Sequence, residues 1–277
     1  MVVKLYGGLD MISINSKILQ ILNLIAIIAT IGFNILVNVI PLNGVYTGDV
    51  ANSYPNFFTP PGWVFSIWGV IYILLITFAV YQVRPNQVDE PYLQKIGLLY
   101  VFNAIANISW LIVFHYSYGN PGLFLWSVIP IALLLVILLL TYVQLEIGLK
   151  GVPLKKKLAV HLPVSVYAGW ISLATIANIA SALNVLIPGI PADVQHLWTA
   201  AVIIIALLIT ILMLYLRHDV AFALVVVWAG FGIAMKQMTI PIIFGTAITA
   251  VVLIVLLILL LPFIRKKGFV DYYLVRD

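Results

Sequence analysis

The sequence contains no cysteine and few charged residues. The absence of cysteine among 277 residues excludes a disulfide-stapled fold and any chemistry that depends on a thiolate. Only 8% of the residues are charged, against roughly a quarter in ordinary soluble domains. So few charges cannot cover a water-soluble surface. The 14 Lys and Arg residues also form no single patch of the kind that binds nucleic acid, so we expect no nucleic-acid partner.

Long apolar runs take the place of the missing charges. Hydrophobic residues make up 64% of the chain, and they occur in runs of about 15 to 25, the length that crosses a bilayer. Short connections with Pro, Gly and Asn separate the runs. We therefore predict an all-α, polytopic membrane bundle in contact with the lipid bilayer. The expected helices span residues 18–40, 62–83, 95–115, 122–146, 158–187, 197–216, 219–237 and 241–264.

The distribution of basic residues orients these helices. With eight spans, every Lys and Arg except Lys236 falls on one side, and basic residues collect on the cytoplasmic side of membrane proteins. We predict eight spans with both termini in the cytoplasm. A seven-span alternative, with 197–237 as one re-entrant unit, places the charged triplet Arg217–Asp219 in mid-membrane, where it is costly. The outer loop 41–61 carries aromatic residues and no Lys or Arg, which is typical of a lid or of an interfacial aromatic belt.

Amides and aromatic rings recur at helical spacing along four of the predicted spans. Such stripes can line a cavity for a flat, mostly apolar ligand, or they can hold helices together without any ligand. The stripes are Asn23, Thr30, Asn34 and Asn38; Trp68 and Tyr72, preceded by Pro60-Pro61-Gly62-Trp63-Val64-Phe65; Tyr100, Asn103, Asn107, Trp110 and Phe114; and Tyr167, Trp170, Ala174, Asn178 and Ser181.

The last three stripes, in this order, resemble the motifs of the TspO family, also called translocator protein, peripheral benzodiazepine receptor or tryptophan-rich sensory protein. The resemblance covers residues 20–187. Asn103 stands where the family usually has Gln, and the spacing from Trp63 to Trp68 is one residue shorter than usual. Classical members end after five helices. We therefore divide the chain into a five-helix ligand-binding core, 1–190, and three additional transmembrane helices with a basic cytoplasmic tail, 191–277.

The resemblance implies binding of porphyrins, and in some members sterols or synthetic ligands, in a pocket under the loop after the first helix. Some bacterial members are reported to degrade protoporphyrin in light, with tryptophans at the positions of Trp68 and Trp170. The resemblance further implies that the protein lies in a prokaryotic plasma membrane and forms a homodimer. The residues expected to bind the ligand are Trp63, Trp68, Tyr72, Tyr100, Asn103, Asn107, Trp110, Tyr167, Trp170, Ala174 and Asn178.

The remaining polar residues argue against other chemistries. The four histidines lie near predicted span ends without a second ligand at metal-binding spacing, so we expect no metal site and no obligatory cofactor. Lys236 has no acidic counter-ion deep in a span, which disfavours a retinal Schiff base. The leading hypothesis is a receptor or carrier for a porphyrin-like or other planar hydrophobic molecule, with porphyrin or haem as possible ligand. A transporter of an amphipathic metabolite and a tryptophan-dependent porphyrin-degrading enzyme stay open as alternatives.

Overall fold

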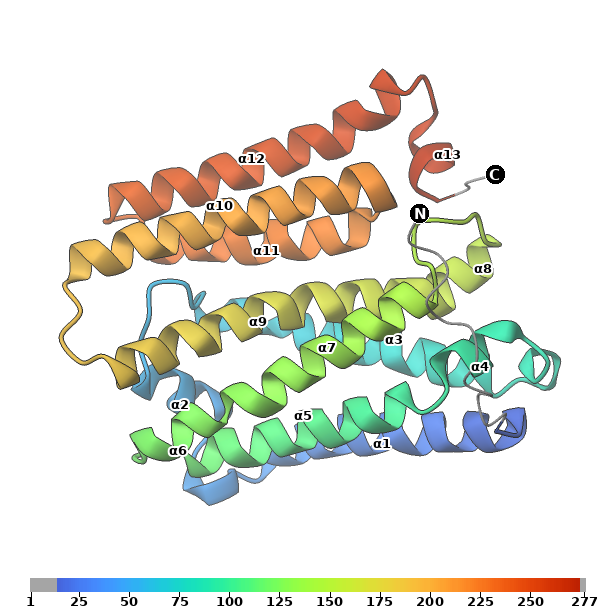
Figure 1. Cartoon of the computed structure of the whole chain (residues 1–277), viewed down its shortest axis with the longest axis horizontal. Helices are drawn as coiled ribbons and strands as arrows, with labels where there is room; N and C mark the ends of the chain where they lie inside the picture. The colour runs from blue at the N-terminus through green and yellow to red at the C-terminus, as the bar shows by residue number, and fades with distance from the viewer. Residues whose placement is uncertain (1–13, 275–277) are drawn as a thin grey trace, which may run out of the picture.

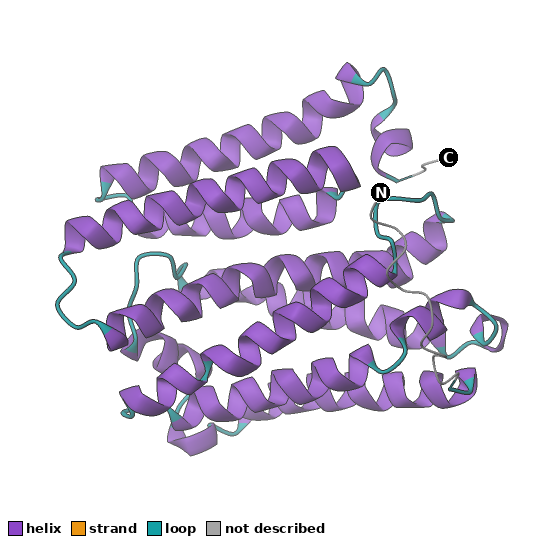
Figure 2. Ribbon diagram, in the orientation of Figure 1, coloured by secondary structure: helices purple, strands orange, loops and turns teal. Residues whose placement is uncertain are grey.

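The computed structural model describes residues 14–274, and this part of the chain is helical with no strand (Figure 2). The predicted all-α membrane bundle is confirmed. The long helices are α1 (Ser16–Val39), α3 (Ile67–Gln82), α5 (Leu99–Tyr116), α7 (Val128–Gln144), α9 (Leu162–Leu186), α10 (Ala192–Arg217), α11 (Val220–Lys236) and α12 (Pro241–Ile264). The short ones are η1 (Leu42–Gly44), α2 (Thr47–Ser53), η2 (Gly62–Ser66), η3 (Pro85–Gln87), α4 (Pro91–Ile96), α6 (Pro121–Trp126), α8 (Leu154–Lys156), the π-helical turn η4 (Lys157–His161) and α13 (Phe269–Tyr273).

The chain is an integral membrane protein. Seven helical segments in the described part are long and apolar enough to cross a membrane: Ser16–Val39, Gly62–Gln82, Leu99–Tyr116, Pro121–Gln144, Leu154–Leu186, Ala192–Arg217 and Pro241–Ile264. The eighth predicted span corresponds to α11, which is apolar but has only 17 residues. At 1.5 Å per residue α11 is about 26 Å long, at the lower limit for a span. The count of eight crossings therefore stays a prediction.

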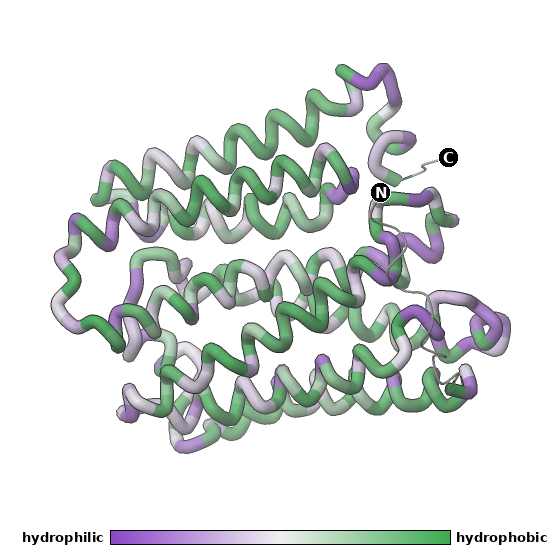
Figure 3. Tube along the Cα trace, in the orientation of Figure 1, coloured by the Kyte–Doolittle hydropathy of each residue, from purple (hydrophilic) through white to green (hydrophobic). Residues whose placement is uncertain are grey.

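Five long helices form a closed ring. α1 packs against α3 and α5, α7 lies between α5 and α9, and α9 returns to contact α3. The turn residues seen in the sequence set the boundaries: Pro121 and Pro241 begin helices, where a missing N–H costs nothing. Gly189, between α9 and α10, has a φ of 82°, which glycine adopts without strain. The hydrophobic stretches run along the helices, and polar residues gather at their ends (Figure 3).

Helices α10, α11 and α12 form a second layer beside this ring (Figure 1). All three pack against one another, and α11 makes the main contact with the ring through α9. The contact is close because α9 presents Gly169, where a Cβ would lie 3.2 Å from the Cβ of Val225 and 3.4 Å from the ring of Phe222. A small residue at a helix interface allows such an approach in a membrane, where packing drives association.

A buried carboxylate joins the layer to the ring. Asp219 is 6% exposed and caps α11 by accepting from the Phe222 backbone N–H at 3.0 Å. Its Oδ2 accepts from the Tyr142 hydroxyl of α7 at 2.8 Å and from the Ser165 hydroxyl of α9 at 2.7 Å. The sequence places Asp219 at the end of a span but gives no sign of this burial. These bonds connect one residue to α7, α9 and α11, so Asp219 holds three helices together.

The two ends of the bundle differ in charge. One end, here called the basic end, carries α4, α8 and α13, and all described Lys and Arg residues except Lys236 belong to helix termini and loops at this end (Figure 1). Lys4 and Arg276, which the sequence assigns to the same side, lie outside the described residues. The opposite end, here called the lid end, carries α2, α6 and Lys236. The helices therefore separate charge as the orientation argument requires.

Labelling of single cysteines tests the orientation and the number of spans. The chain has no native cysteine, and Asn52, Lys155 and Thr239 are all exposed. We expect an impermeant maleimide to label Asn52→Cys and Thr239→Cys in intact cells, and Lys155→Cys only after permeabilisation. Thr239 follows α11. If Thr239→Cys were labelled under the same conditions as Lys155→Cys, and not as Asn52→Cys, then α11 would not cross the membrane. Labelling of Lys155→Cys alone in intact cells would reverse the orientation.

Candidate functional site

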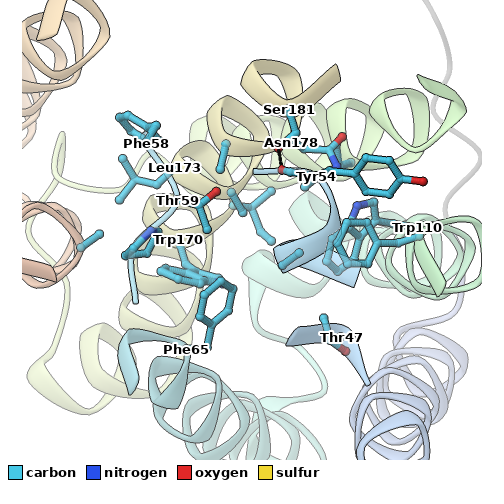
Figure 4. Close-up of a pocket in the computed structure, with 18 of the residues that line it drawn as sticks. Thr47, Tyr54, Phe58, Thr59, Phe65, Trp110, Trp170, Leu173, Asn178 and Ser181 are labelled. Carbon is cyan, nitrogen blue, oxygen red and sulfur yellow. Dashed lines mark hydrogen bonds between the residues drawn. The ribbon is translucent and has the colours of Figure 1, made fainter. Parts of the chain in front are cut away.

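An aromatic cavity lies inside the ring near the lid end. It has a volume of about 80 Å³, and none of its lining residues carries a charge. Figure 4 shows Trp170 and Phe65 on one side of the cavity, and Trp110 and Tyr54 on the other. The aromatic lining residues are Tyr54, Phe58, Phe65, Trp68, Trp110, Phe114, Phe124 and Trp170.

The rings on the cavity wall pack mainly against one another. Trp170 meets Phe65 edge-on at a centroid distance of 5.5 Å and Trp68 edge-on at 6.4 Å. On the opposite wall Trp110 stacks on Phe114 at 4.9 Å. Edge-to-face and offset arrangements at these distances are favourable for aromatic pairs, so the rings hold one another in place and offer flat apolar surfaces.

Two hydrogen-bond donors on this wall have no partner among the residues that the structure describes. The indole N–H groups of Trp110 and Trp170 are buried and make no hydrogen bond, although Trp110 is only 9% exposed and Trp170 only 3%. A buried donor without an acceptor costs about 1–3 kcal/mol, and buried Trp N–H groups usually find a partner. The cavity therefore suits a ligand that is mostly apolar and brings one or two acceptors.

The segment 41–61, here called the lid, closes the cavity toward the lid end. Tyr54 stacks on Phe124 at 3.9 Å, and its hydroxyl donates to the backbone carbonyl of Ser117. Burial raises the pKa of the Tyr54 phenol above its ordinary value. Asn56 donates to the Ser181 hydroxyl at 2.7 Å, and Ser181 in turn donates to the Tyr54 carbonyl. These bonds fix the lid against α5, α6 and α9.

Helices α9 and α11 also hold the backbone of the lid and of η2. Three of the donors lie at or just past the C-terminal ends of these helices, Trp228 lies in the middle of α11, and each acceptor is a carbonyl. The bonds are Asn184 to Pro55 (3.0 Å), Gln237 to Phe57 (3.0 Å), Lys236 to Thr59 (3.0 Å) and Trp228 to Val64 (2.9 Å). Three of the four donors belong to α11 and its C-terminal turn, so the second layer takes part in closing the cavity.

A second, larger volume lies outside the lid end of the cavity. It measures about 620 Å³ and shares Tyr54 and Ser181 with the lining of the aromatic cavity. We call it the vestibule. It is lined by Ser53, Tyr54, Pro55, Asn56, Phe57, Ser181, Asn184, Val185, Ala192, Gln195, Lys236 and Gln237. Tyr54 therefore stands between a polar outer volume and an apolar inner one.

The structure brings five of the predicted ligand-binding residues to the aromatic cavity and places six outside its lining. The five are Trp68, Trp110, Trp170, Ala174 and Asn178. Trp63 is 46% exposed and meets Trp228 of α11 edge-on at 5.0 Å, because η2 turns it outward. Tyr72 stacks on Trp68 at a centroid distance of 5.8 Å but does not itself line the cavity. The other four residues are Tyr100, Asn103, Asn107 and Tyr167.

These four lie deeper in the ring, toward the basic end. Tyr100, Asn103 and Tyr167 line a separate cavity of about 10 Å³, which is the size of one water. Asn107 is fully buried; its Oδ1 accepts from Asn34 of α1 at 2.6 Å, and its Nδ2 donates to the Tyr167 hydroxyl of α9 at 3.0 Å. Asn34, Asn107 and Tyr167 thus join α1, α5 and α9 below the aromatic cavity.

Sequence reasoning missed part of the wall. Phe124, Ala229 and Ile233 line the cavity, and the last two belong to α11. Nothing in their spacing distinguishes them from residues that face lipid. Tyr54 and Phe58 gave a signal, because aromatic residues in an outer loop without Lys or Arg are typical of a lid. Among the described residues no group of three His, Asp or Glu side chains is placed to hold a metal ion.

Comparison with known proteins gives one match. The family model described as "TSPO-like protein" matches residues 20–260 of the chain. The match covers the ring and runs on through α10 and α11 into α12. No curated protein and no solved structure matches the chain.

Replacing Asn107 with Leu tests its role as a helix connector. Leu fills a similar volume but cannot hydrogen-bond, so the bonds to Asn34 and Tyr167 are both lost. We expect the free energy of unfolding in mild detergent to fall by about 1–3 kcal/mol. Asn103→Leu is the matched control one turn away, with a smaller loss expected because it breaks no connection between α1 and α9. Equal losses in the two variants would show that the network does not hold the ring.

Proposed function

The chain belongs to the family of TSPO-like proteins, and on this premise we propose that it is a membrane receptor or carrier for a planar, mostly apolar small molecule of the porphyrin type. The ligand binds in the aromatic cavity between Trp68, Trp110 and Trp170. The observation that carries the proposal is the pair of buried, unpartnered indole N–H groups on a wall without charges. Flat rings provide stacking surface, and the two donors suit acceptors on the ligand.

The size of the cavity adds a condition. Small-molecule sites usually have volumes of about 300–1,000 Å³, whereas this cavity has about 80 Å³. A porphyrin-sized ligand therefore requires the lid to move, so that Tyr54 no longer separates the cavity from the vestibule of about 620 Å³. We propose that the ligand enters from the lid end and that the lid closes behind its apolar part.

Binding explains the wall better than catalysis does. General acid–base chemistry needs a group that gains or loses a proton within reach of the substrate. Among the residues lining the cavity, only the Tyr54 phenol can ionise, and burial moves its pKa further upward, away from neutral pH. A porphyrin-degrading reaction would have to use the indoles of Trp68 and Trp170 alone. We therefore propose a binding protein, with transport of an amphipathic molecule as the second candidate because two volumes flank Tyr54.

The topology completes the proposal. We propose eight spans with both termini cytoplasmic and the lid facing outward, which the separation of basic residues between the two ends supports. A prokaryotic plasma membrane and a homodimer are carried over from the resemblance to classical members.

Porphyrin titration of tryptophan variants tests the site. Trp110→Phe and Trp170→Phe keep an aromatic ring but remove the unpartnered N–H together with part of the stacking surface. We expect each to weaken protoporphyrin binding at least about fivefold, the effect of one neutral hydrogen bond. Trp68→Phe should weaken binding through lost stacking, by about 1–2 kcal/mol. The change in protoporphyrin absorption reports binding without depending on protein fluorescence.

The matched control is Trp126→Phe. Trp126 is 63% exposed and does not line the cavity. The Trp126→Phe variant should therefore bind protoporphyrin with the affinity of the wild type. Unchanged affinity in all three cavity variants would remove the aromatic cavity as the binding site.

Weakening the lid tests the closure step. Gln237→Leu removes the donor to the Phe57 carbonyl at similar side-chain volume. Loss of about 1 kcal/mol from the closed state raises the open population about fivefold. We expect protoporphyrin to associate and dissociate severalfold faster in stopped-flow measurements. Thr239→Val, two residues further along the same turn, removes none of the lid bonds and should leave both rates unchanged. Wild-type rates in Gln237→Leu would show that the ligand does not pass the lid.

A further inference from the structure

The vestibule carries one positive charge and no negative one. Lys236 lines it together with the amides of Asn56, Asn184, Gln195 and Gln237, and no Asp or Glu belongs to the lining. The Lys236 ammonium donates to a neutral acceptor, the Thr59 carbonyl, at 3.0 Å. A backbone carbonyl orients the ammonium without neutralising it. Lys236 is also the one Lys or Arg that the sequence assigns to the lid end, and the acidic residues of that end, Asp49 and Asp193, lie outside the vestibule lining.

The vestibule and the aromatic cavity follow one another along the same two helices. On α9, Ala177 and Ser181 line the cavity, and Ser181 and Asn184 line the vestibule. On α11, Ile233 lines the cavity, and Lys236 lines the vestibule less than one turn further on. From Ala177 to Asn184 the helix rises about 10 Å. A molecule whose apolar body lies in the cavity therefore extends along these helices toward the vestibule and its ammonium.

From this arrangement we propose that Lys236 binds a carboxylate of the ligand in the vestibule, so that the protein selects amphipathic acids with a flat apolar body. The inference rests on the proposed function of the aromatic cavity and names the class of its ligand. The apolar body lies between the tryptophans and the acidic group lies among the vestibule amides. A carboxylate accepts charge-assisted hydrogen bonds from an ammonium, and such bonds are shorter and stronger than neutral ones.

The site gives the last three helices a role. Lys236 and Gln237 come from α11 and its C-terminal turn, and Ala192 and Gln195 come from the start of α10. The five-helix ring alone supplies the lid and α9 side of the vestibule but not its cation. The Lys236 ammonium also donates to the Thr59 carbonyl of the lid. A carboxylate bound to Lys236 therefore lies next to one of the hydrogen bonds that hold the lid closed.

Binding of protoporphyrin and of its dimethyl ester to the full-length protein in mild detergent tests the proposal. The ester keeps the flat body and masks both carboxylates. We expect the wild type to bind the free acid about fivefold to tenfold more tightly than the ester, and the difference to narrow as salt screens the exposed charge. In Lys236→Met the affinity for the acid should fall to that for the ester, while the ester binds as before. Lys236→Arg keeps the charge and should keep the preference for the acid.

Lys155→Met is the matched control, since it removes an exposed charge at the basic end, away from the vestibule. It should bind both compounds as the wild type does. Equal wild-type affinity for acid and ester would overturn the inference and leave the proposed function intact. An equal loss for both compounds in Lys236→Met would also overturn it, because it would show that Lys236 only holds the lid. Failure of the wild type to bind either compound would remove the proposed function and this inference together.

Discussion

The core of a bilayer offers no bulk water to bond buried polar groups, and the structure depends on how these groups find partners in one another. An unpaired amide, hydroxyl or carboxylate is expensive there, so most interior polar side chains select a particular neighbour, the buried amide of Asn23 being an exception in the described part of the chain. Asn107 bonds Asn34 and Tyr167 and so joins three helices of the ring. Asp219 bonds Tyr142 and Ser165 and so joins the second layer to the ring. Lipid-facing residues cannot provide this specificity, because Leu and Ile pack equally well against lipid tails and against other helices.

The same constraint makes the exceptions informative. Around the aromatic cavity the indole N–H groups of Trp110 and Trp170 have no partner, although the surrounding frame is well bonded. Just outside, the carbonyls of Pro55, Phe57 and Thr59 are all held by side chains from α9, α11 and the turn after α11. The wall therefore has hydrogen-bond donors without partners, and the lid above it is held by several separate hydrogen bonds. This is the arrangement expected of a site that opens to admit a ligand.

The three helices after the ring belong to this arrangement. They approach α9 at Gly169, contribute Ala229 and Ile233 to the cavity wall, and provide Trp228, Lys236 and Gln237 as donors to the lid and η2. The family model likewise extends through them as far as residue 260. In physical terms, α11 covers a side of the ring that would otherwise face lipid, and it adds polar groups at the lid end that the ring lacks.

The sequence by itself determined that the protein lies in a bilayer, that it is built of helices and which family it resembles. Long apolar runs with so few charges can only be stable in a bilayer as helices, and the motifs around Trp68, Trp110 and Trp170 mark those helices as TspO-like. Helical spacing also showed that the polar residues form stripes, since a 3.6-residue period requires no knowledge of neighbours. It could not show what each stripe faces. Only the tertiary structure divided the third stripe, so that Trp110 lines the aromatic cavity while Asn107 connects helices below it. It also decided that Trp63 turns toward α11 and that Asp219 is buried. These outcomes depend on the rotation of each helix about its axis and on which helix lies opposite, and both are set by packing between segments far apart in the chain.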